Sequence, residues 1–105
     1  MNYALSDLAA FEANAFDVAQ VLRALANERR LMILCKLVEW GEANVNSLAE
    51  AVGLSQSALS QHLAKMREEG IVAFRREGQT LWYRVADPRI RLLLKQLQKL
   101  YCPPA

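Results

Sequence analysis

The sequence has 105 residues, 53% hydrophobic and 23% charged, which fits one small globular domain over residues 1–105 and excludes a mainly disordered chain. It holds no apolar run near the roughly 20 residues of a membrane span and no cationic, apolar leader, so we expect a cytoplasmic protein without membrane contact. The net charge of +2 is unevenly spread: residues 1–52 carry four basic and seven acidic residues, and residues 53–105 carry nine and four, which favours a polyanionic partner for the second half.

A first amphipathic helix is predicted from about residue 6 to residue 25. Ser6 is a suitable N-cap, and the apolar residues that follow are spaced by three and four. These residues are Leu8, Phe11, Ala15, Val18, Leu22 and Leu25. One small domain rarely covers so wide an apolar stripe, so we expect part of this helix to face a partner chain.

The second predicted helix begins after Asn27, its expected N-cap, and ends at Gly41. It is apolar on nearly all sides, which is typical of a helix buried at the centre of a domain. Cys35 lies within its apolar stripe.

Two shorter helices follow, at about residues 47–52 and 56–69, with Asn46 and Ser55 as their expected N-caps. A tight turn, Gly53-Leu54-Ser55, joins them. Two short helices joined in this way predict a helix-turn-helix over about residues 47–69.

A β-hairpin and a last helix complete the chain. Residues 71–76 and 80–85 are rich in β-branched, aromatic and arginine residues and flank a glycine turn, which predicts a hairpin over about residues 71–86. Asp87-Pro88 is typical of a helix start, so a helix is predicted over about residues 88–102.

This order of elements predicts a mainly α fold, a winged helix-turn-helix with a two-stranded β-hairpin as the wing. The major groove of B-DNA admits one α-helix, and side chains that both donate and accept hydrogen bonds read its base edges. We therefore expect the helix at 56–69 to enter the major groove and the hairpin to contact backbone phosphates or the minor groove. The candidate DNA-binding residues are Gln56, Ser57, Ser60, Gln61, His62, Lys65, Arg75, Arg76 and Gln79.

Three segments resemble the ArsR/SmtB family of bacterial winged-helix repressors. They are LANERRLMIL at residues 25–34, VGLSQSALSQHL at residues 52–63 and MREEGIV at residues 66–72. The resemblance implies a homodimer built from the first and last helices, a palindromic operator in double-stranded DNA, and release by an inducer. The dimer-interface residues expected on these helices are Leu8, Phe11, Ile90, Leu94, Leu97 and Tyr101.

The residues that hold metals in this family have no counterpart here. Its metal sensors resemble one another in having Cys-x-Cys near the third helix, or Asp/His and His/Glu pairs on the last helix. Residues 42–48 contain no cysteine, and residues 88–101 contain no His, Asp or Glu. We therefore expect neither a metal site nor a cofactor.

The two cysteines, Cys35 and Cys102, are similar in position to those of the sulfide- and persulfide-responsive branch of the family. In that branch the two thiols become joined by a disulfide or a polysulfide, and DNA is released. The resemblance thus implies a repressor with a redox switch at Cys35 and Cys102, with reactive sulfur species or an oxidant as the inducer. Their spacing alone does not show that they meet.

Other functions stay open at this point. The same fold with a metal inducer, or with an anti-repressor or virulence-activator role, is one alternative. A winged helix that only binds proteins is another, although it predicts no base-reading residues at 56–69. We do not expect an enzyme, because the sequence offers no Cys/His or Ser/His/Asp cluster and no glycine-rich phosphate loop.

Overall fold

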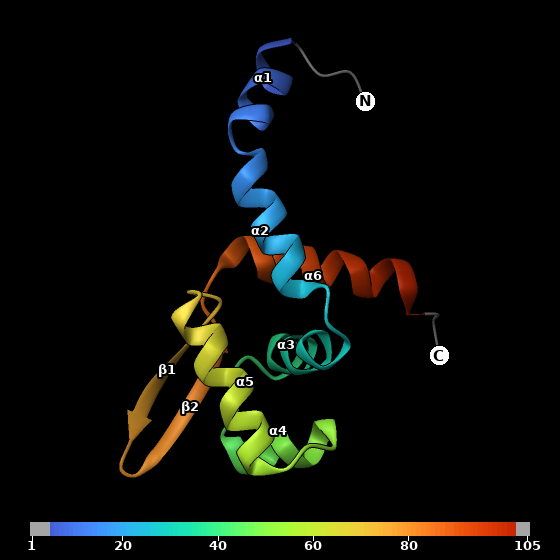
Figure 1. Cartoon of the computed structure of the whole chain (residues 1–105). Coiled ribbons are helices and arrows are strands. Elements are labelled where there is room, and N and C mark those ends of the chain that lie inside the picture. Colours follow the sequence, from blue (N-terminus) through green and yellow to red (C-terminus); the bar gives the residue numbers. More distant parts are fainter. Residues whose placement is uncertain (1–4, 103–105) are drawn as a thin grey trace.

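A computed structural model describes residues 5–102 and confirms a mainly helical winged helix-turn-helix with a two-stranded wing (Figure 1). No helix in this part of the chain is long and apolar enough to cross a membrane. The elements in chain order are α1 (Leu5–Ala13), α2 (Ala15–Leu25), α3 (Glu28–Trp40), α4 (Val45–Val52), α5 (Gln56–Glu68), β1 (Val72–Glu77), β2 (Thr80–Val85) and α6 (Pro88–Tyr101).

The single helix predicted over residues 6–25 is two helices, α1 and α2, and the side chain of Ser6, the expected N-cap, lies outside the part that the structure describes. The break falls at Asn14, whose side-chain amide donates to the carbonyl of Ala10 at 3.1 Å while its backbone N–H donates to the carbonyl of Phe11 at 3.0 Å. An asparagine side chain that bonds to nearby backbone competes with the regular helical pattern. The apolar spacing therefore continues across a point where the backbone does not.

The N-caps expected at Asn27, Ser55 and Asp87 are confirmed, since each side chain accepts a hydrogen bond from a backbone N–H two or three residues on. The cap expected at Asn46 is wrong. Helix α4 begins at Val45, and Asn44 is its cap, accepting from the N–H of Ser47 at 2.9 Å. The reason lies one residue earlier, where Ala43 pairs with a residue of β2 in an isolated bridge, so the chain is extended until the helix starts.

Helix α3 is the centre of the core, as its sequence predicted. Its side chains Ile33, Leu34 and Leu37 have no exposed surface, and the helix contacts α2, α4, α6 and β2. From α5, Leu59, Leu63 and Met66 also have no exposed surface, so that helix is seated by one apolar side.

The wing is an antiparallel hairpin whose register runs from Val72 opposite Val85 to Glu77 opposite Thr80. The pairing continues to Glu77, one residue beyond the predicted first strand. At the base of the wing, Ala43 and Tyr83 exchange two backbone hydrogen bonds of 3.0 and 2.8 Å. This bridge adds a third chain segment to a hairpin that would otherwise have only two.

The dimer residues expected on the last helix need a correction. Ile90 and Leu94 are buried in the core of the chain itself, with 2% and 0% exposure, so they do not present a surface to a partner. The first half of α6 packs against α3 and β2, which accounts for their burial. Leu97 is half-buried, whereas Leu8, Phe11 and Tyr101 are exposed.

The exposed apolar side chains gather on the parts that extend from the body. In Figure 1, α1 and the start of α2 extend away on one side, and the C-terminal half of α6 extends on another. The chain exposes 7590 Å², against roughly 5900 Å² expected for a compact monomer of this mass. Its radius of gyration is 15.7 Å, against roughly 13 Å for a compact domain of this length. Apolar side chains exposed on α1, α2 and α6 include Leu8, Phe11, Phe16, Leu22, Leu92, Leu100 and Tyr101.

The burial of Leu94 can be tested by stability. Leu94→Ala should lower the free energy of unfolding by about 2–5 kcal/mol, because it leaves a cavity in the core. Met32→Ala shortens a side chain of α3 that is 53% exposed and lies outside the apolar surface of α1, α2 and α6, so its effect should be clearly smaller. Urea unfolding at one fixed protein concentration measures both, and equal effects would contradict the placement of Leu94.

Candidate nucleic-acid interface

Helix α5 presents a row of uncharged polar side chains to solvent. Gln56, Ser57, Ser60 and Gln61 are all exposed, and their spacing of one and four residues places them on one face. The opposite face is the buried one that packs on the core. A seated helix with a free row of short hydrogen-bonding groups has the form needed to read base edges in a major groove.

The turn before α5 sets where this row points. Gly53 ends α4 with a φ of +69°, a left-handed conformation that glycine adopts without strain. The N–H of Leu54 then donates to the carbonyl of Ala49 at 3.0 Å, and the hydroxyl of Ser55 accepts from the N–H of Ala58 at 3.1 Å. The hydrogen bonds that end α4 and begin α5 thus fix the backbone of the turn, and with it the direction of α5.

The C-terminal end of α5 is held by Arg30 at the start of α3. Its guanidinium forms two parallel hydrogen bonds with the carboxylate of Glu69, at 3.0 and 3.2 Å, and donates to the carbonyl of Ala24 at 3.4 Å. The Arg30 side chain is only 11% exposed. A bidentate pair shielded in this way joins the ends of α2, α3 and α5.

The two other predicted DNA-binding residues on α5 differ from the exposed row, His62 in its burial and Lys65 in its position at the edge toward α2. His62 is half-buried on the flank of the helix, next to the buried Leu63. Lys65 is exposed but lines a cavity that α2 also lines, through Asp17 and Arg23 among others. The row of glutamines and serines is therefore the part of the helix that is free of other elements.

In the wing, Arg76 and Gln79 are exposed, as a contact with DNA requires. Arg76 makes no ion pair within residues 5–102. The turn between the strands is held by Gly78, with a φ of +62°. Gln79 directly follows this glycine and lies beside Asn46 and Ser47 of α4 along a shallow pocket.

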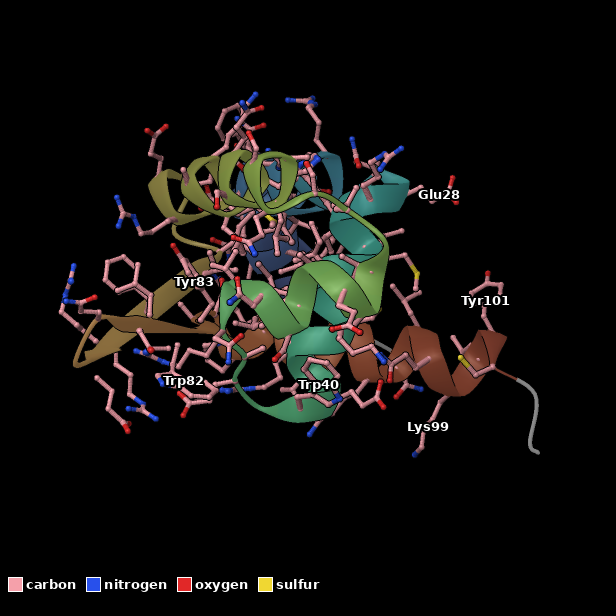
Figure 2. The ribbon with its side chains drawn as sticks, turned by 90° about the horizontal axis from the view of Figure 1, so that it is seen from below. Glu28, Trp40, Trp82, Tyr83, Lys99 and Tyr101 are labelled. Carbon is pink, nitrogen blue, oxygen red and sulfur yellow. The ribbon has the colours of Figure 1, made fainter. Side chains whose placement is uncertain are left out.

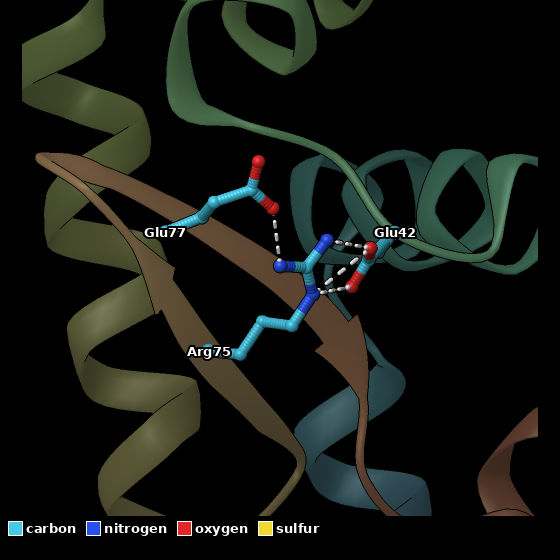
Figure 3. Close-up of polar contacts among 3 residues, drawn as sticks. All are labelled: Glu42, Arg75 and Glu77. Atoms are coloured by element: carbon cyan, nitrogen blue, oxygen red, sulfur yellow. Dashed lines mark hydrogen bonds and ion pairs between the residues drawn. The ribbon is translucent and has the colours of Figure 1, made fainter.

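Arg75 differs from its neighbour, because two carboxylates already surround it (Figure 3). One guanidinium nitrogen, Nη2, lies 2.6 Å from Oε1 of Glu42, and Nη1 lies 2.7 Å from Oε2 of Glu77. The hydrogen bond from Arg75 holds the pKa of the Glu42 carboxyl below its ordinary value, and the two carboxylates raise the pKa of Arg75. The sequence alone predicted the same DNA-contacting role for Arg75 and Arg76. In the structure Arg75 is paired with two carboxylates, whereas Arg76 forms no ion pair within residues 5–102.

Both cysteines are free thiols, on the elements expected from the sequence. Cys35 is half-buried on α3 and packs against the core. Cys102 is exposed and caps the C-terminus of α6, where its N–H donates to the carbonyl of Gln98 at 2.9 Å. Figure 2 shows the neighbouring Tyr101 at the far end of that helix. Within residues 5–102, no three His, Cys, Asp or Glu side chains gather as metal ligands would.

Comparisons with known proteins now give the family. The model of the bacterial regulatory proteins of the arsR family matches residues 27–73. The transcriptional activator HlyU of Vibrio cholerae is 43% identical over 96 residues, which cover 91% of this chain and 88% of that protein. The chain belongs to the arsR family.

Solved structures agree with this membership. Reduced HlyU from Vibrio cholerae matches with a TM-score of 0.81 and 42% identity, over 90% of this chain and 98% of that one. The transcriptional repressor BigR from Xylella fastidiosa matches with a TM-score of 0.83 and 35% identity, over 97% of this chain and all of that one. The chain is thus a transcriptional regulator with a DNA-binding helix-turn-helix.

The sequence analysis did not identify Glu69 and Glu42, the carboxylates that pair with Arg30 and Arg75. Glu42 is 33 residues from Arg75, and Glu69 is 39 residues from Arg30. No local pattern carries a pairing over such distances. Both acids looked like ordinary surface residues.

Two substitutions separate the expected roles on α5 and on the wing. Arg76→Gln should weaken binding to all DNA sequences and lower the slope of log K against log salt by about one, because one phosphate contact is lost. Gln61→Ala should instead reduce the difference in affinity between preferred and random duplexes, and it should leave the slope of log K against log salt unchanged. Fluorescence anisotropy over a salt series measures both. Unchanged affinity in both variants would show that the DNA-binding surface lies elsewhere.

Proposed function

We propose that this chain is a dimeric, operator-binding repressor that releases DNA when Cys35 and Cys102 become linked by reactive sulfur species or an oxidant. The observation that carries the proposal is the pair of free thiols, one on the central core helix and one at the end of α6. Those are the positions in which the sequence resembles the persulfide-responsive branch. Among similar proteins, HlyU from Vibrio cholerae has a structure described as reduced, which is in keeping with a thiol-dependent state.

The apolar surface of α1, α2 and α6 supports a dimer. A second copy of the chain is the natural cover, and a two-fold interface can set α1 of one protomer against α6 of its partner, and the reverse. Charge agrees with this pairing. Helices α1 and α2 carry three acidic residues and one basic residue, whereas α6 carries four basic residues and no acidic one.

A two-fold dimer implies a palindromic operator. The two copies of α5 would meet successive major-groove faces, whose centres are about 34–36 Å apart on B-DNA. Binding then depends on the distance between the two helices as well as on their side chains. A small change in dimer geometry is enough to lower affinity.

The chemistry of the switch needs a sulfur donor or an oxidant. In the persulfide case, the thiolate of Cys102 attacks the terminal sulfur of a low-molecular-weight persulfide, forms a protein persulfide and releases a thiol. The thiolate of Cys35 then attacks the Cys102 sulfur bonded to Cβ, and hydrogen sulfide leaves. Two cysteine thiols are thereby oxidised to a disulfide, and the persulfide is reduced to a thiol and hydrogen sulfide.

Exposure gives the order of these two steps. Cys102 is exposed to solvent, so it meets the donor first. Cys35 is half-buried against the core and resolves the intermediate. The resulting bridge ties α3 to the end of α6 and moves the helix that supplies part of the dimer surface.

The dimer is tested on α6. Leu100→Glu places a charge on an apolar side chain that is 68% exposed, and should shift the protein to monomers at micromolar concentration. Gln79→Glu adds the same charge at an exposed position of the wing, outside the apolar surface of α1, α2 and α6, and serves as the control. Sedimentation equilibrium gives the masses. A wild-type protein that is monomeric at these concentrations would contradict the proposed dimer.

The switch is tested with glutathione persulfide. Treatment should lower affinity for a duplex that the reduced protein selects from a random pool, and mass spectrometry should find Cys35 and Cys102 in one cross-linked peptide pair. Cys35→Ser and Cys102→Ser should each bind DNA when reduced and keep that affinity after treatment. Full affinity in treated wild-type protein, with both thiols free, would rule out the switch and leave the DNA-binding role intact.

A further inference from the structure

The two arginines of the wing point to opposite sides of it. Successive side chains of a strand alternate between faces, so Arg76 shares a face with Phe74, and Arg75 does not. Phe74 packs 5.4 Å from the ring of Tyr83, and the guanidinium of Arg67 on α5 lies 4.9 Å from the Phe74 ring centroid. The face with Phe74 and Arg76 is therefore the one that adjoins the DNA-reading helix.

Arg75 occupies the other face, where the segment between α3 and α4 approaches the wing. Its guanidinium bonds Glu42 through Nε, at 3.1 and 3.2 Å, as well as through Nη2. It also lies 5.7 Å from the ring centroid of Trp82, its cross-strand neighbour. The side chain is thus held by a carboxylate from outside the wing, a carboxylate from its own strand and an aromatic face.

The contacts of Arg75 lie one cross-strand pair beyond the backbone bridge that holds the wing. The bridge between Ala43 and Tyr83 fixes the base, and Glu42 immediately precedes Ala43. The pair of Arg75 and Trp82 is the next one toward the turn. A two-stranded hairpin has little stability of its own, so its direction depends on such contacts.

We propose that Arg75 is a positioning residue, which fixes the direction of the wing by clamping it to Glu42, and that it makes no contact with a DNA phosphate. Its role is to hold Arg76 and Gln79 where they meet the DNA. If Arg75 bound a DNA phosphate, the carboxylates of Glu42 and Glu77 would both lose their ion-pair partner. Two unpaired negative charges would then lie close to the negatively charged DNA. The hydrogen bond from Arg75 lowers the pKa of the Glu42 carboxyl, so this acceptor of the clamp stays ionised to a lower pH than an unpaired glutamate.

The inference rests on the proposed binding of operator DNA, and a salt series separates the two. The probe is a duplex of about 30 base pairs that the wild-type protein selects from a random pool. Arg75→Gln should weaken binding about two- to fivefold, the range in which an exposed ion pair acts, with the slope of log K against log salt unchanged. Arg76→Gln should lower that slope by about one. Failure of the wild-type protein to select any duplex would count against DNA binding itself.

A charge exchange tests the clamp directly. Glu42→Arg and Arg75→Glu should each weaken binding. The double variant should return to within about twofold of the wild type, because the guanidinium introduced at position 42 would then pair with both acids of the wing. Arg84→Gln is the matched control, since Arg84 shares the face of Trp82 and forms no ion pair in the described residues. If the loss of one positive charge were the whole cause, Arg84→Gln would lower the affinity for DNA as much as the substitutions at positions 42 and 75.

The clamp also has a readout that needs no DNA. In a Trp40→Phe background, Trp82 is the only tryptophan, and both Arg75→Gln and Glu42→Gln should change its emission and raise its mobility. A fall of about one in the salt slope of Arg75→Gln, or an Arg75→Gln variant with wild-type affinity, would overturn the proposal. So would a double variant as weak as the single ones.

Discussion

The burial of one helix, α3, is the constraint on which the rest of the structure depends. Its side chains Ile33, Leu34 and Leu37 are wholly enclosed, and α2, α4, α6 and the second strand of the wing all pack on it. Because α5 and the wing are seated on this core by apolar contacts, their polar sides remain outside. The candidate DNA-binding surface is therefore a consequence of which residues α3 buries, with little separate structure of its own.

Much of this was predictable because the signals were local. The caps at Asn27 and Ser55, the turn at Gly53 and the hairpin around Gly78 are each set by a few adjacent residues. Where the prediction was wrong, a second local or distant interaction competed. Asn14 interrupts a helix whose apolar spacing continues across it, and Asn44 replaces Asn46 as a cap because Ala43 is held by the wing.

The candidate site was predictable in composition but not in detail. The polar row on α5 follows from helical spacing, whereas the different surroundings of Arg75 and Arg76 follow from pairing across the fold. Strand alternation alone places the two arginines on opposite faces, but it does not say which face adjoins α5. Likewise, the apolar stripe of α6 gave Ile90 and Leu94 as dimer residues, and only the packing shows that they belong to the core.

The two arginine clamps bear on how a thiol switch would reach the DNA. Arg30 ties α5 to α2 and α3, and Arg75 ties the wing to the segment that follows α3. The candidate reading helix is thus linked to the helix that carries Cys35, and the wing is linked to the segment that directly follows it. A bridge to Cys102 acts on α6, whose exposed half is the expected dimer surface. The change would then fall on the relation between protomers, because the internal geometry of each reading unit is held by ion pairs that the bridge does not touch. Such a movement would change the distance between the two copies of α5, which must match the half-site spacing that duplex DNA fixes within narrow limits.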